Sequence, residues 1–194
     1  MKKEFVTAIL LLALGAPATV VYANAQAKAD EKPTFAAVYD RLLSGQEKEV
    51  VSAAEAMPDD KFNFVPSTTQ GEFKGVRTFA QQVKHIAGAN YLLGSGILGE
   101  KPPAAAGGED GPANVTSKAD VMKYLQDSFA YLHKALATVN ESNILEKVQS
   151  PFGPNKITRL ALATIAVSHP QDHYGQMVEY LRMNGIIPPA SRKQ

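Results

Sequence analysis

Two histidines near the C-terminal end of the 194-residue chain are the strongest chemical signal in the sequence. His169 and His173 are four residues apart, and on a helix this spacing separates two side-chain directions by only about 40°. Both continue a series of core-type positions, at steps of three or four residues, with Leu162, Ala166 and Met177. Neutral imidazoles are good ligands for divalent zinc, nickel or iron. The pair therefore predicts part of a metal site; the alternative is two buried histidines, each hydrogen-bonded to a neighbour.

A third ligand has to come from another part of the chain, and the other two histidines are the candidates. His133 lies round from the apolar face of its predicted helix, beside Lys134, so we expect it on a solvated flank. His85 belongs to a second stripe of its own helix, which contains Thr78, Gln82, Ala89 and Leu92. Because a helix in a bundle touches two neighbours, a second inward stripe is reasonable. Periodicity alone nevertheless leaves the choice of His85 open.

Four amphipathic segments are expected to position these side chains. Apolar residues recur at helical intervals over residues 34–57, 76–98, 117–140 and 156–184. The connections over 58–75, 99–116 and 141–155 contain the Pro and Gly residues typical of loops, and we expect no packed element within 99–116. No segment alternates with period two for long enough to indicate a strand. The sequence thus predicts an all-α four-helix bundle.

One residue disturbs the last of these helices. Pro170 stands between the two C-terminal histidines and cannot donate a hydrogen bond to the carbonyl of Ala166. It also disfavours helical geometry at His169. We therefore expect the helix either to kink at this point or to restart there, with Ser168 or His169 as its cap.

The N-terminal end has the three parts of a secretory signal peptide. A short basic start, an apolar run from Phe5 to Leu14 and the triplet Ala23-Asn24-Ala25 follow one another. We predict a signal peptide over residues 1–25, a leader over 26–33 and one helical domain over 34–194, exported to the periplasm or the exterior. The apolar run is shorter than the roughly 20 residues that span a bilayer, so no stable membrane insertion is expected after cleavage.

Charge and composition narrow the function classes. Without the predicted signal peptide, acidic and basic side chains balance, so there is no electrostatic reason to expect a nucleic acid as partner. The chain has no cysteine, which rules out disulfides, thiolate ligands and a cysteine nucleophile. Any chemistry must therefore use histidines, carboxylates, hydroxyls or a bound cofactor.

Two stretches of the chain resemble a known family. Residues 169–189, which begin His-Pro-Gln-Asp-His-Tyr-Gly-Gln, resemble the closing helix of the DinB-like (YfiT-like) family of metalloenzymes. The segment Phe79–Tyr91 resembles that family's second helix, where one ligand histidine lies, and the loop after Met57 fits as well. The resemblance covers nearly all of the chain after the predicted signal peptide. It implies a four-helix bundle that holds a divalent metal ion.

The resemblance also implies the ligands. The three metal-binding positions of the family match His85, His169 and His173, whereas His133 matches none. Pro170 departs from the helix-favouring residue that the family has at its position, which concerns the local geometry rather than the identity of the ligands. Zinc, nickel and iron are all compatible with such a site.

A site with three neutral histidines leaves a divalent ion its full charge and an open position, which suits an enzyme. The resemblance implies hydrolysis or a thiol-dependent transfer on a small molecule, although export disfavours the latter because such thiols are mainly cytosolic. Two alternatives stay open: a non-catalytic exported protein whose ion braces two helices, and a helical interaction protein without metal. A homodimer is compatible with all three hypotheses.

Catalytic residues other than the ligands cannot be assigned from the sequence. Asp172 and Glu179 lie near the histidines along the chain, and we expect both to be solvated. Tyr174 and Tyr180 are expected to pack as core aromatic residues.

Overall fold

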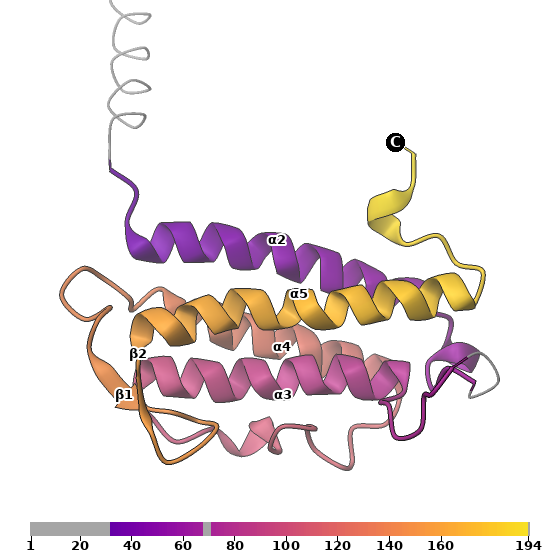
Figure 1. Ribbon diagram of the computed structural model, residues 1–194, viewed down its shortest axis with the longest axis horizontal. Coiled ribbons are helices and arrows are strands. Elements are labelled where there is room, and N and C mark those ends of the chain that lie inside the picture. The colour runs from indigo at the N-terminus through magenta and orange to yellow at the C-terminus, as the bar shows by residue number, and fades with distance from the viewer. Residues whose placement is uncertain (1–31, 68–70, 194) are drawn as a thin grey trace, which may run out of the picture. The chain divides into compact units, whose positions relative to one another are not determined.

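The computed structural model describes residues 32–67 and 71–193, and in this part of the chain four long helices form (Figure 1). They are α2 Phe35–Ala56, α3 Phe79–Leu98, α4 Lys118–Leu136 and α5 Arg159–Met183. Their number and order confirm the predicted four-helix bundle. The predicted signal peptide and nearly all of the leader lie outside the described residues.

Each long helix begins at a residue whose hydroxyl caps it. Thr34, Thr78, Ser117 and Thr158 accept hydrogen bonds from backbone N–H groups three residues further on. Such caps satisfy one of the free N–H groups of the first turn. At α3 the side chain of Gln81 returns a bond to the backbone of Thr78, which completes a capping box. The sequence therefore predicted the start of each helix to within about three residues.

The order of the helices around the bundle places α3 beside α5. Helix α3 contacts both α5 and α4. Helix α2 contacts α5 and α4 from the other side, which closes the ring of four helices. The core between them is apolar and includes Phe79, Phe129, Leu132, Leu162 and Met177, all fully buried. Burial of these side chains is the main force that holds the helices together.

A short β-hairpin contradicts the prediction that the chain contains no strand. Strand β1 Lys147–Gln149 pairs antiparallel with β2 Lys156–Thr158, so α5 begins three residues later than the predicted position 156. Each strand has only three residues, too few for an alternating pattern to be visible. The pairing depends on the turn between them, where Ser150 N–H donates to the Asn155 carbonyl.

The connection between α3 and α4 also differs from its prediction, because it contains a packed element. The 3-10 helix η3, Ala104–Ala106, contacts α3, and Ala106 is buried. The hydroxyl of Tyr124 donates to the Ala106 carbonyl at 2.6 Å. This connection is therefore attached to the outside of α3 and α4 by specific bonds.

Helix α5 does not restart at Pro170. It runs without interruption from Arg159 to Met183, with Pro170 inside it and buried. The carbonyl of Ala166 loses only the one donor that proline lacks. None of the helices in the described ranges is long and apolar enough to cross a membrane.

Candidate metal centre

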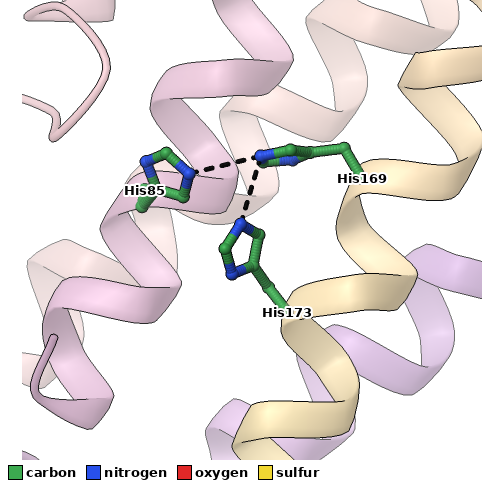
Figure 2. Close-up of side chains that lie close together, drawn as sticks. All are labelled: His85, His169 and His173. Carbon is green, nitrogen blue, oxygen red and sulfur yellow. Dashed lines mark hydrogen bonds between the residues drawn. The ribbon is translucent and has the colours of Figure 1, made fainter. Parts of the chain in front are cut away.

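Three of the four histidines come together between α3 and α5 (Figure 2). His85 extends from α3, while His169 and His173 extend from consecutive turns of α5. The Nε2 atom of His169 lies 3.2 Å from Nε2 of His85 and 3.2 Å from Nε2 of His173. The possible ligand atoms of all three lie within 4.8 Å of one another. Within the described residues this is the one group of three or more such side chains that could hold a metal ion.

The spacing of these nitrogens fits a shared cation. In a tetrahedral site with metal–nitrogen bonds of about 2.0–2.1 Å, neighbouring ligand nitrogens lie about 3.3–3.4 Å apart. The two separations of 3.2 Å are close to that value. Little movement of the rings is therefore needed for all three to reach one ion.

Hydrogen bonds between the rings alone cannot satisfy this cluster. His85 Nδ1 lies 3.0 Å from the carbonyl oxygen of Glu109, so Nδ1 carries the proton and the lone pair of Nε2 faces the other rings. His169 Nε2 faces two nitrogens at once, and a single N–H or lone pair cannot align with both. The Nδ1 atoms of His169 and His173 are buried and have no hydrogen-bond partner among the described residues. A cation among the Nε2 atoms removes the conflict between the rings.

The surroundings keep all three rings neutral. Burial lowers the pKa of His169 to about 3, with the neighbouring rings of His173 and His85 and the Arg77 guanidinium lowering it further. Burial likewise lowers the pKa of His173 to about 4. The pKa of His85 is also lowered, first by burial and then by Arg77. Neutral imidazole is the form that binds metal, so at neutral pH protonation of the rings does not oppose the binding of an ion.

Comparison with known proteins gives this chain a family. The model of the DinB superfamily matches residues 42–177, a range that starts in α2 and ends in α5 and so contains all three clustered histidines. The chain belongs to the DinB superfamily. The crystal structure of YjoA, a DinB-like protein from Bacillus subtilis, is similar in fold, with a TM-score of 0.57 and 17% sequence identity. That similarity covers 80% of this chain and 99% of YjoA. No curated protein matches the chain.

One contact to the cluster of this DinB protein was not foreseen from the sequence. The carbonyl of Glu109, which accepts from His85, belongs to the connection predicted to lack packed structure. The connection can approach because Gly88 has no side chain: a Cβ there would lie 2.5 Å from the Gly108 oxygen and 2.7 Å from the Glu109 oxygen. A glycine in the interior of a helix was the available signal for such a close approach.

The fourth histidine is not a member of the cluster, and it is only partly solvated, although the sequence predicted a solvated flank. His133 Nδ1 lies 2.6 Å from an oxygen of Asp40, and its Nε2 lies 3.1 Å from an oxygen of Glu47. Its side chain is 22% exposed, because α4 packs against α2 and covers the ring. The two carboxylates lie on opposite nitrogens of the ring, an arrangement that links two helices and does not converge on an ion.

The remaining residues singled out from the sequence lie outside the cluster. Asp172 and Glu179 are exposed, as expected. Tyr180 is buried, and its hydroxyl donates to the Arg77 carbonyl at 3.0 Å. Tyr174 is partly buried against the core. None of the four supplies a group within the set of nitrogens described above.

Proposed function

We propose that His85, His169 and His173 bind one divalent metal ion and that this protein uses the ion as a metal-dependent enzyme. The observation that carries the proposal is the convergence of three Nε2 atoms in a buried cluster, with two separations of 3.2 Å. The lowered pKa values of the three rings support it, because metal competes with protons for the same lone pairs. Membership of the DinB superfamily is consistent with it. Zinc, nickel and iron all suit three imidazoles.

A bound divalent ion would supply a Lewis acid that polarises a substrate oxygen or sulfur. The residues of the chain prepare the site. His85 is held in one tautomer by the Glu109 carbonyl, and α5 presents the other two rings from consecutive turns. Three protein ligands leave a position for a fourth group, which is typical of catalytic rather than structural zinc sites. The reaction classes that fit are hydrolysis and thiol-dependent transfer on a small molecule.

Metal content tests the ligands directly. Protein purified without added metal is analysed for bound elements, as wild type and as His173→Ala. We expect the substitution to remove most of the bound ion. His133→Ala is the matched control, since it removes a histidine that faces Asp40 and Glu47, and it should keep the wild-type metal content. Unchanged metal in folded His173→Ala, with folding checked by circular dichroism, refutes the site.

Turnover separates the enzyme from a protein whose ion only braces α3 against α5. Ester, amide and thiol substrates are assayed with the metal-loaded and the chelated protein. Metal-dependent turnover supports the enzyme. If chelation lowers the melting temperature and no substrate class reacts, the non-catalytic alternative is correct.

We also propose that the protein is exported. The support is the order of basic start, apolar run and small-residue triplet in residues 1–25. N-terminal sequencing of the protein from its native host tests this: a start at or near Gln26 agrees with export, and a start at Met1 contradicts it.

A further inference from the structure

A cleft of about 750 Å³ is lined by residues that neighbour the histidine cluster along α3 and α5, although none of the three histidines is in its lining. Gln82, one turn before His85 on α3, and Gln176, one turn after His173 on α5, are both among its lining residues. Gln82 Nε2 donates to Gln176 Oε1 at 2.6 Å, so this amide pair joins the two helices that carry the histidines. Asp110, also in the lining, lies 3.9 Å from His85 Nδ1. The volume is within the range of small-molecule sites.

Hydrogen-bond donors with spare capacity line this cleft. Arg77 directs Nε and one Nη2 hydrogen at a single oxygen of Asp110, at 3.3 and 3.1 Å, which leaves three of its five N–H groups for another acceptor. Lys84 donates one ammonium hydrogen to the Pro112 carbonyl at 2.7 Å, which leaves two for another acceptor. Arg77 and Lys84, both positively charged, therefore keep five N–H groups without a partner among the described residues.

The guanidinium of Arg77 already pairs with one carboxylate of the chain, that of Asp110. Asp110 is 78% exposed on the connection between α3 and α4, so water competes for it and the pair is weak. A carboxylate from a ligand can take the place of Asp110 on Arg77 with little loss, because the replaced side chain returns to solvent.

The wall of the cleft beside the cluster adds a polar group that the protein leaves unsatisfied. Gln82 is only 3% exposed, and its Oε1 has no hydrogen-bond partner among the described residues. A buried acceptor without a partner costs about 1–3 kcal/mol. This oxygen is itself closed to solvent, but the terminal amide torsion of glutamine is soft. A rotation that exchanges the Gln176 bond for one to a ligand N–H brings the oxygen to the cleft.

From these contacts we infer that the cleft binds a small carboxylate that also carries an amide N–H, with its carboxylate on Arg77 and Lys84 and its N–H toward Gln82. The carboxylate and the amide then lie along the wall that adjoins the histidines. Calling this compound a substrate rests on the proposed function; its binding in the cleft does not.

Hippurate, which has one carboxylate and one amide, is a probe for this inference, and hippuramide is its uncharged partner. Both are titrated into the 15N-labelled protein with and without zinc, and amide shifts of Arg77, Gln82 and Gln176 are followed. We expect hippurate to shift these signals and to bind at least about tenfold more tightly than hippuramide, because a charge-assisted pair to arginine is lost in the latter.

Three variants of the full chain make the test specific. Arg77→Gln should weaken hippurate about tenfold and leave hippuramide unchanged. Asp110→Asn should tighten hippurate several-fold, because the competing carboxylate is gone. Lys134→Gln removes an exposed lysine of α4 that is outside the cleft and should change neither. The opposite signs expected for Arg77→Gln and Asp110→Asn cannot come from a general loss of folding.

The inference is overturned if hippurate and hippuramide bind alike, if Arg77→Gln leaves hippurate affinity intact, or if inorganic phosphate binds and hippurate does not. Zinc content is measured on the same samples. Zinc binding without hippurate binding overturns the cleft assignment alone, and hippurate binding without zinc binding overturns the metal site alone.

Discussion

Gly88→Ala tests whether the connection between α3 and α4 helps to hold His85, one of the three proposed metal ligands. The added Cβ would lie 2.5 Å from the Gly108 oxygen and 2.7 Å from the Glu109 oxygen. Both are backbone atoms, so no side chain can rotate out of the way. The connection must therefore move away from α3.

The size of that movement follows from the distances. Ordinary contact begins at 3.4 Å, so the connection has to retreat by about 0.7–0.9 Å, which is enough to take the 3.0 Å contact between His85 Nδ1 and the Glu109 carbonyl out of hydrogen-bond range. Loss of such a partner from a metal-bound histidine lowers metal affinity about 10- to 100-fold. The effect on folding is smaller, because crowding costs about 1–3 kcal/mol while alanine gains about 1 kcal/mol over glycine in a helix.

The assay is competition for zinc with a chromogenic chelator, together with urea unfolding of the metal-free protein. Gly175→Ala is the matched control: it also exchanges a helical glycine close to a proposed ligand, His173, but its Cβ would meet nothing within 4 Å. We expect it to stabilise the protein by about 0.5–1 kcal/mol and to keep wild-type zinc affinity. If Gly88→Ala binds zinc as tightly as Gly175→Ala does, the connection does not support His85 and the reasoning is wrong.

Two further predictions concern stability. Burial lowers the pKa of His169 from 6.5 to about 3 in the folded state, so in metal-free protein the unfolded chain takes up the proton first as the pH falls. His169 alone should then lower the free energy of unfolding by roughly 2 kcal/mol between about pH 7 and pH 5, and His173, whose pKa is lowered to about 4, should add a drop of similar size. A urea series at each pH should therefore show a flatter profile for His169→Ala than for the wild type; equal slopes would contradict the lowered pKa of His169. Thr78→Ala removes the cap of α3 and should cost about 1 kcal/mol, whereas Thr78→Ser keeps the hydroxyl and should cost much less in the same urea experiment.

The fold was largely predictable because its signals are local. Each long helix has its own apolar period, and each begins at a threonine or serine that can cap it from within its own first turn. The hairpin was missed because the pairing of Val148 with Ile157 joins residues nine positions apart, and three-residue strands carry no period of their own. His133 was misplaced for a similar reason, since Asp40 and Glu47 come from a different helix.

In the candidate site, too, some features follow from local sequence and others from tertiary packing. The spacing of His169 and His173 by itself brings both rings to one face of a helix, because the α-helical turn is a property of the local chain. The packing of α3 against α5 decided that His85 lies beside these two rings. Periodicity left the choice of His85 open, and only the resemblance to the family indicated it. The Glu109 contact was decided by tertiary structure alone: a backbone carbonyl is the same in every residue, so the sequence marks only the glycine that lets it approach.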